Sequence, residues 1–278
     1  MKAPFSEYLN GIADGLKKMI EDLEKDYEYV SILATDSKGF KIVTSTKIRN
    51  VTTQNFTTER GVVVRVAQNS HYSEFALNDF SGEKWKESAE EIRTAFTRSE
   101  GLLKECHVAP YKTGILSDEP AHVFYEGEAE QLPETCSLAG IVEEMSGFCR
   151  KVAEMSEHTV EVQSSAQSTH ISKMFLTHNR DMRQSYVYTE ATVIPFLAED
   201  GKSAHGYMGV SGKCGPEIIA TLKEQLEPAV RQAEDILHAD RIVPGEYDII
   251  TSPEVSGLIA HEAFGHGVEM DQFVKHRA

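Results

Sequence analysis

The sequence predicts an α+β fold in which helices pack on antiparallel sheets. Strand-like segments occur in runs separated by short polar turns, and segments with helical periodicity stand before and after these runs. This grouping is typical of α+β proteins, whereas strands that alternate with helices indicate a doubly wound sheet. The order helix, strands, helix occurs twice along the chain. With 278 residues, of which 40% are hydrophobic, the chain can bury a substantial core.

The first half of the chain begins with an amphipathic helix over residues 6–25. Its apolar residues recur at near-helical intervals and so share one face. They are Tyr8, Leu9, Ile12, Leu16, Met19, Ile20 and Leu23. Strands are predicted next at residues 29–34, 40–46, 61–67 and 72–77, with turns at 37–39 and 68–70. A charged helix at 84–100 and a proline-containing connector at 108–134 complete this half.

The second half repeats the order with a helix at 138–157. Four strands are predicted after it, at residues 159–167, 171–177, 185–195 and 206–211. A helix then begins at Gly215-Pro216 and continues to His238. Because the composition changes at residues 241–245, we expect an N-terminal α+β domain over 1–241 and the start of a second domain at 242–278. Within the first domain, 1–107 and 118–241 are candidate sub-units.

The second domain is expected to open with a strand and a helix. Tyr247 to Thr251 form a compact, largely apolar run after the turn residues Pro244 and Gly245, which predicts a short buried strand. The sequence Thr251-Ser252-Pro253-Glu254 then resembles a helix start, with hydroxyl caps and a proline in the first turn.

Two histidines and a glutamate lie at the end of this predicted helix. His261, Glu262 and His266 offer two metal ligands and a general base, the residue types that catalytic zinc sites use. A spacing of five residues rotates the two histidines about 140° apart on a regular α-helix. Both can bind one ion only if the helix widens to a π-type turn or unwinds between them. We expect Gly265 and Gly267 to permit this departure, because glycine tolerates unusual backbone conformations.

Three segments carry a resemblance to a known family. The strongest is Gly257-Leu258-Ile259-Ala260-His261-Glu262-Ala263-Phe264-Gly265-His266-Gly267-Val268-Glu269-Met270-Asp271. Weaker matches lie at Arg60 to Val66 followed by Tyr72 to Asp79, and at Phe175 to Asp181. Together they resemble the TldD/PmbA family, bacterial and archaeal proteins once called modulators of DNA gyrase. The histidine-glutamate pattern is similar to the metal-bearing TldD branch.

The resemblance implies a zinc-dependent peptidase that acts on peptides or unfolded protein segments. It implies that His261 and His266 are the metal ligands and that Glu262 is the catalytic base. In the family the third ligand is a distant cysteine, so we expect the third ligand beyond Ala278, in a metallopeptidase domain of which 242–278 is a truncated start. Zinc is then expected to be weakly held or absent in this chain, and the chain alone to be inactive.

The resemblance also implies an assembly role for the N-terminal region. We expect a homo-oligomer, or a hetero-oligomer with a PmbA-like subunit. The alternative function is a non-catalytic assembly or regulatory module that lacks the third ligand. Two roles stay open for Glu269 and Asp271, which either hydrogen-bond the second ring nitrogen of a ligand histidine or are solvated acids. His276 is expected to be an exposed residue rather than a ligand.

Composition excludes several classes of function. A formal net charge of −16 argues against direct nucleic-acid binding, which needs clustered basic residues. No stretch approaches the ~20 apolar residues of a membrane span, so a cytoplasmic protein is expected. The four scattered cysteines indicate neither a disulfide framework nor a thiolate zinc site. No cluster in the sequence suggests a serine or cysteine nucleophile.

Overall fold

The structure is a computed structural model that describes residues 1–47, 52–54, 59–109, 112, 118–274 and 277. Two long antiparallel strands are the longest elements of its sheet. The strands are β6 (Thr159–Leu176) and β7 (Arg180–Glu199), and they pair along nearly their whole length. Clustering of the described residues gives two units, one over Met1–Val108 and Lys112–Ala239 and one over Asp240–Ala278 with Ala109–Tyr111.

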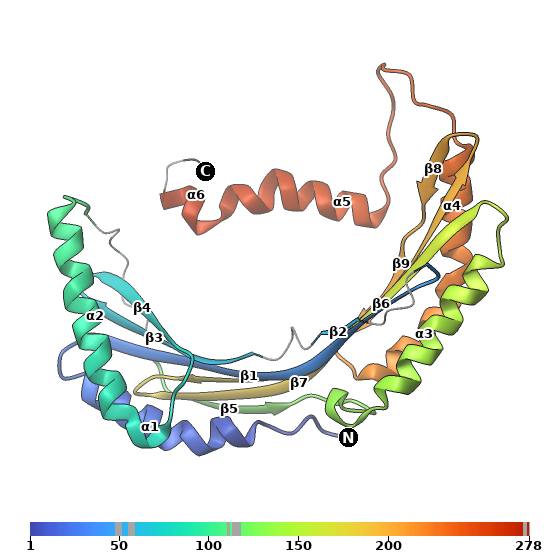
Figure 1. Cartoon of the computed structure of the whole chain (residues 1–278). Helices are drawn as coiled ribbons and strands as arrows, with labels where there is room; N and C mark the ends of the chain where they lie inside the picture. The colour runs from blue at the N-terminus through green and yellow to red at the C-terminus, as the bar shows by residue number, and fades with distance from the viewer. Residues whose placement is uncertain (48–51, 55–58, 110–111, 113–117, 275–276, 278) are drawn as a thin grey trace. The chain divides into compact units, whose positions relative to one another are not determined.

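The described strands of the first unit form one nine-stranded sheet. Its order is β4-β3-β1-β6-β7-β5, with β2 beside β1 and with β8 and β9 beside β7 (Figure 1). The remaining strands are β1 (Tyr29–Ser45), β2 (Thr52–Gln54), β3 (Arg60–Gln68), β4 (His71–Leu77), β5 (Ala121–Glu126), β8 (Lys202–His205) and β9 (Met208–Gly212). Every pairing is antiparallel except that of β5 with β7, which is parallel. The predicted α+β fold class is confirmed, with a single sheet.

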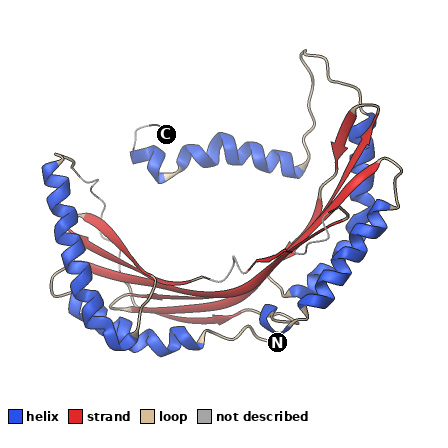
Figure 2. Ribbon diagram, viewed as in Figure 1, coloured by secondary structure: helices blue, strands red, loops and turns tan. Residues whose placement is uncertain are grey.

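Helices of the first unit cover one face of this sheet (Figure 2). The helical elements are α1 (Glu7–Leu23), η1 (Gly82–Lys84), α2 (Trp85–Glu105), η2 (Pro133–Thr135), α3 (Leu138–Ala153), η3 (Pro216–Gln225) and α4 (Leu226–His238). The spacing of apolar residues in α1 explains its place, because all of its strongly apolar positions from Leu9 to Leu23 are buried. Ser6 caps α1 by accepting a hydrogen bond from the Leu9 amide at 3.2 Å.

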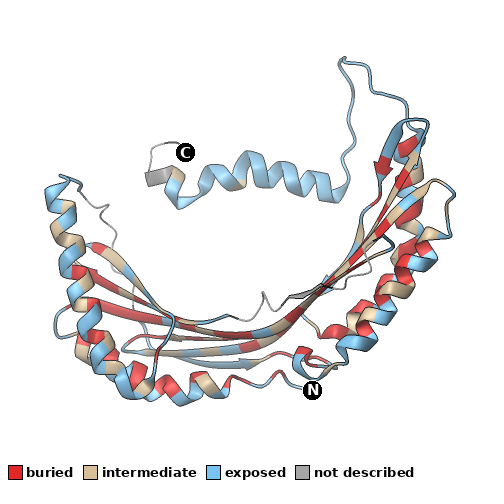
Figure 3. Ribbon diagram, viewed as in Figure 1, coloured by how far each residue is buried: buried red, intermediate tan, exposed pale blue. Residues whose placement is uncertain are grey.

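Two hydrophobic cores lie between the helices and the sheet, and Figure 3 shows the buried positions on these facing surfaces. The first core packs α1 and α2 against β1, β3 and β4, and the second packs α3, η3 and α4 against β6 and β7. β1 contributes Ile32 to the first core and Ile42 to the second. β6 likewise contributes Met174 to the first and Val162 to the second. The two cores therefore share their longest strands.

Several predicted element boundaries are wrong. The turn at 37–39 does not exist, because β1 runs unbroken through it and pairs with β6 from Ile32 to Ser45. The break predicted between residues 167 and 171 is absent for the same reason. β5 lies inside the predicted connector at 108–134. Its central residues, Val123, Phe124 and Tyr125, are consecutive apolar residues, and all three side chains are exposed. The segment therefore lacks the alternation of apolar and polar residues by which a half-buried strand is predicted from sequence.

The second unit begins with an irregular segment from Asp240 to Ser252. The strand predicted at Tyr247 to Thr251 is not formed, and the Ile250 side chain is fully exposed. A strand needs a neighbour for its backbone hydrogen bonds, and no described strand pairs with this run. Helical elements follow, namely α5 (Pro253–Ala260), η4 (His261–Gly265), η5 (His266–Val268) and α6 (Met270–Val274).

Two further expectations concern the chain as a whole. All four cysteines, Cys106, Cys136, Cys149 and Cys214, are free thiols, and Cys149 is the buried one among them. No helix among the described residues has the length and apolar character needed to cross a membrane.

Candidate metal centre

The helix that carries the predicted site is fixed at its start by side-chain caps. The Ser252 hydroxyl accepts a hydrogen bond from the Val255 amide at 3.4 Å, and Pro253 occupies the first turn. Thr251 bonds to the Ser256 hydroxyl at 2.6 Å instead of capping the helix itself. The predicted helix start is confirmed, with Ser252 as the capping residue.

The helix widens where the two histidines lie. Residues His261–Gly265 form a π-helical turn, in which the His266 amide donates to the His261 carbonyl five residues earlier. One π turn nearly restores the orientation that a five-residue spacing loses on an α-helix. The two imidazole rings consequently face each other edge to face, with 4.6 Å between their centroids. The predicted widened turn is confirmed.

The glycines do not act as expected in this turn. Gly265 has φ −56° and ψ −51°, which is ordinary right-handed helical backbone that any residue can adopt. A β-carbon at Gly265 would lie 3.8 Å from Nδ1 of His261, an ordinary contact distance. The wide turn is therefore made by its hydrogen-bond pattern and does not depend on the conformational freedom of glycine.

Acidic side chains surround the second histidine. Nδ1 of His266 lies 2.7 Å from Oε1 of Glu269, and this hydrogen bond raises the pKa of His266. Because a carboxylate accepts, Nδ1 donates in this contact and Nε2 is left for a metal. Nε2 lies 3.6 Å from Oε2 of Glu262. Of the two predicted supporting acids, Glu269 makes the expected contact, Asp271 stays a prediction, and His276 lies outside the described residues.

The resulting cluster has the donor set of a transition-metal site. His261, Glu262 and His266 each offer one ligand atom, and these atoms lie within 4.8 Å of one another. All three residues are exposed. Two imidazole nitrogens suit zinc, and catalytic zinc sites use three protein ligands with a fourth position for water. The cluster supplies two imidazoles and a carboxylate that can serve as a base.

A second group of catalytic residue types lies inside the first unit. Oγ of Ser185 is 2.9 Å from Nε2 of His170, and Nδ1 of His170 is 2.8 Å from Oε1 of Glu134. Sequence reasoning missed this serine-histidine-glutamate arrangement because η2, β6 and β7 bring the residues together from separate segments. Ser185 is completely buried and also contacts the Pro4 carbonyl at 3.1 Å. Since no substrate reaches a hydroxyl enclosed in this way, the group is a buried hydrogen-bond network.

Comparison with curated proteins finds a relative that is named a metalloprotease. No protein-family model matches the chain. A protein named metalloprotease from Methanothermobacter thermautotrophicus is 24% identical over 265 residues, which cover 93% of this chain and 54% of that relative. The chain therefore spans about half the length of the curated relative it matches.

Solved structures with the same fold agree with the predicted resemblance. A protein from Bacteroides thetaiotaomicron described as a candidate modulator of DNA gyrase has a TM-score of 0.67 at 11% identity, over 91% of this chain and 56% of that structure. A similarly described protein from Thermotoga maritima has a TM-score of 0.61 at 14% identity, over 84% and 50%. TldE from Thermococcus kodakarensis has a TM-score of 0.57 at 12% identity, over 79% and 47%. The resemblance to the TldD/PmbA family is confirmed at the level of the fold.

Proposed function

We propose that this chain is part of a zinc-dependent metallopeptidase that hydrolyses peptides or unfolded protein segments. The observation that carries the proposal is the π-helical turn, because it brings His261 and His266 together beside Glu262. The relative named metalloprotease supports a hydrolase of this kind. In the proposal His261 and His266 are metal ligands and Glu262 is the general base.

In the proposed reaction the metal, Glu262 and Glu269 have separate roles. Bound zinc would polarise the peptide carbonyl and lower the pKa of a water molecule. Glu262 would accept the proton of that water during attack and pass it to the leaving amine. Glu269 holds Nδ1 of His266, which keeps Nε2 directed toward the other two residues. The proposal includes a third protein ligand from beyond residue 278, since catalytic zinc usually has three.

The base assignment is tested in the longer protein with Glu262→Gln. Glutamine keeps the shape of glutamate but cannot accept the proton, so peptide hydrolysis should fall by about 10² to 10⁴-fold while bound zinc is unchanged. Glu246→Gln is a matched control, because Glu246 is an exposed acid in the preceding irregular segment. Hydrolysis that survives Glu262→Gln with zinc still bound would show that Glu262 is not the base.

The alternative proposal is a non-catalytic assembly or regulatory module. It is favoured by the exposure of all three site residues and by the presence of only two imidazoles in the cluster. Tight stoichiometric zinc that is lost in both His261→Ala and His266→Ala would count against it. An oligomer, either of this protein alone or with a PmbA-like subunit, belongs to both proposals and is tested by the mass of the purified complex. A cytoplasmic location stays a prediction.

A further inference from the structure

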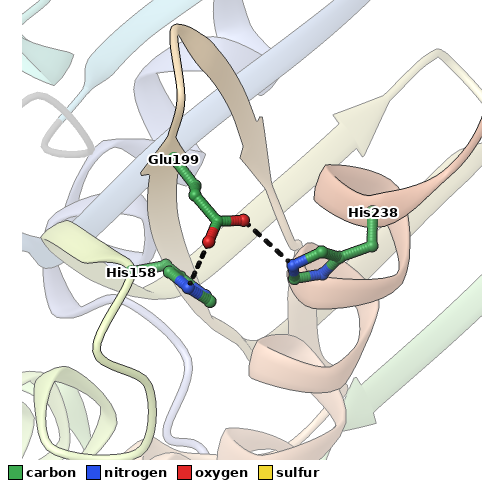
Figure 4. A group of neighbouring side chains, drawn as sticks. All are labelled: His158, Glu199 and His238. Atoms are coloured by element: carbon green, nitrogen blue, oxygen red, sulfur yellow. Dashed lines mark hydrogen bonds and ion pairs between the residues drawn. The ribbon is translucent and has the colours of Figure 1, made fainter.

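Another pair of histidines meets a glutamate at one end of the first unit. His158 precedes β6, Glu199 ends β7 and His238 ends α4 (Figure 4). Nε2 of His158 lies 3.2 Å from Oε1 of Glu199, and Nε2 of His238 lies 3.2 Å from Oε2 of the same carboxylate. The two imidazole rings are 5.5 Å apart between centroids. Three separate elements thus direct their side chains to one point.

The surrounding structure fixes these three elements. Asp200 and Gly201 have φ values of 46° and 77°, which form a tight hairpin turn directly after Glu199. A small core of Leu197, Ala204, Ala233 and Leu237 packs this hairpin against α4. A β-carbon at Gly206 would lie 2.0 Å from the Ala229 carbonyl oxygen, so α4 approaches the sheet as closely as backbone allows. The cluster is held on rigid elements.

Glu234 sets the orientation of both rings. Its carboxylate lies 3.3 Å from Nδ1 of His158, and its backbone carbonyl lies 2.9 Å from Nδ1 of His238. Carbonyl and carboxylate oxygens accept, so each Nδ1 donates and each neutral ring presents the lone pair of Nε2 to Glu199. A lone pair opposite a carboxylate oxygen is repulsive. Each contact therefore needs a cation between its atoms, either a proton on each ring or one metal ion shared by both.

We propose that His158, Glu199 and His238 bind one divalent transition-metal ion, zinc above all, through both Nε2 atoms and a carboxylate oxygen. Bonds of about 2.0 to 2.2 Å in tetrahedral geometry separate ligand atoms by about 3.4 Å. Each Nε2 lies at a similar distance, 3.2 Å, from one oxygen of Glu199, that of His158 from Oε1 and that of His238 from Oε2, so either oxygen of this carboxylate can be the ligand. Two imidazoles and one carboxylate are a known zinc donor set that leaves a fourth position for water. The exposed fractions of Glu199 and His238, 41% and 52%, leave that position open to solvent.

The competing occupant is a pair of protons. The hydrogen bond to Glu234 raises the pKa of His158, and Glu199 adds to this effect. Glu199 and Glu234 are the acids that contact the two rings, one from β7 and one from α4. The charge of Glu157, which precedes His158 in the chain, raises the pKa of His158 as well. Because a ligand imidazole must be neutral and the pKa of His158 is raised, zinc affinity should already be falling when the pH decreases to about 6.5, the ordinary value of an imidazole.

The proposal is tested by zinc titration of the chain with His261→Ala and His266→Ala, which removes the other histidine cluster. Calorimetry at pH 7.5 should give one equivalent of bound zinc, and saturating zinc should raise the thermal midpoint by several degrees because the ligands join three elements. Adding Glu199→Gln or His238→Ala should weaken binding at least tenfold and abolish the shift. His122→Ala is the control, since His122 is exposed on β5 outside either cluster.

Two results would overturn the proposal. The first is that Glu199→Gln, added to the chain that carries His261→Ala and His266→Ala, leaves the zinc affinity unchanged. The other is zinc binding that is equally weakened by His122→Ala. Cobalt provides a second readout that does not depend on stability, because tetrahedral Co²⁺ bound by imidazoles absorbs visible light strongly and the aqueous ion does not. The thermal midpoints without metal show whether each variant is folded.

Discussion

Three of the four histidines in the two proposed sites have Nδ1 held by an oxygen atom. Glu269 holds His266, and the carboxylate and backbone carbonyl of Glu234 hold His158 and His238. Such contacts fix the ring orientation and raise the basicity of the free nitrogen, and their loss typically weakens metal binding by 10 to 100-fold. The oxygen atoms that hold Nδ1 are therefore expected to affect metal affinity, as the ligand rings do.

Glu269→Ala in the longer protein should weaken zinc binding by about 10 to 100-fold, because the His266 ring would lose the partner of Nδ1. Competition with a zinc-binding dye measures the change. Glu246→Ala serves as the control, since Glu246 is an exposed acid in the irregular segment before α5. Unchanged zinc affinity in Glu269→Ala would show that this contact does not support the metal site.

A strongly perturbed acid lies in the first unit. Arg183 and Lys17 each contact Asp181 at 2.7 Å and lower the pKa of its carboxyl to about 2. The side chain is 17% exposed, so solvent screens these ion pairs only in part. A lowered pKa means that the ion pairs stabilise the folded state above the unfolded value near 3.8. This stabilisation is lost as the pH falls through the folded value.

Asp181→Asn should lower the free energy of unfolding by about 2 kcal/mol at pH 7, from the shift in pKa. Urea unfolding from pH 7 to pH 2 measures the difference between the two proteins. The difference should stay constant down to about pH 4 and shrink toward pH 2, where about half of the folded molecules carry a protonated Asp181. A difference that persists unchanged at pH 2 would mean that the loss is in packing and not in charge.

At the scale of elements, the π-helical turn shows what the motif alone could predict. Because His261 and His266 are five residues apart, they can bind one ion only if the backbone departs from the regular α-helix. A π-type turn and an unwound segment are the two ways in which it can do so. The role expected for Gly265 was wrong, since sequence reasoning took conformational freedom as the remedy where a shifted hydrogen bond is sufficient.

Gly265→Ala should therefore keep zinc affinity within about threefold, because an alanine fits the backbone angles and its β-carbon would meet Nδ1 of His261 at 3.8 Å and the Ala260 carbonyl oxygen at 3.9 Å, both ordinary contact distances. Alanine also favours helix over glycine by about 1 kcal/mol, so α5 and the wide turn should not lose stability. Zinc titration of the longer protein, together with its thermal midpoint, checks both expectations. A tenfold loss of affinity would show that the turn needs a conformation which only glycine adopts.

Strand boundaries were harder to predict than helices, for a physical reason. The periodicity of α1 is local and survives in the structure, whereas the length of β1 is decided by its partner. Pairing with β6 carries β1 through Ser37, Lys38 and Gly39, which locally favour a turn. In contrast, the turn between β3 and β4 was predicted from its residue types, because asparagine and serine are common in tight turns. Asn69 and Ser70 adopt the positive φ values of such a turn.

At the scale of the molecule, side chains that meet across elements were beyond sequence reasoning. His158, Glu199 and His238 are far apart in the sequence and meet only because the hairpin after β7 packs on α4. The pair His261 and His266 was found because one short helix carries both residues. A third ligand for that pair remains part of the proposal.

The two cores of the first unit are joined by shared strands. Ile32 and Ile42 lie ten residues apart on β1, and both are completely buried, one in each core. β6 pairs with β1 across this whole distance, from Ile32 to Ser45. Neither core can unfold without breaking hydrogen bonds of strands that also form the other core. We therefore expect the first unit to unfold in one cooperative transition although it contains two cores.

Ile32→Ala and Ile42→Ala test this coupling as a matched pair. Each substitution should lower the free energy of unfolding by about 2 to 5 kcal/mol through loss of buried volume. Calorimetry should show one transition of the first unit that moves to lower temperature in both variants, with equal calorimetric and van't Hoff enthalpies. Leu102→Ala, at a half-exposed position of α2, should leave the midpoint nearly unchanged. If Ile32→Ala separated a low-temperature transition while Ile42→Ala separated a different one, the cores would be independent despite their common strands.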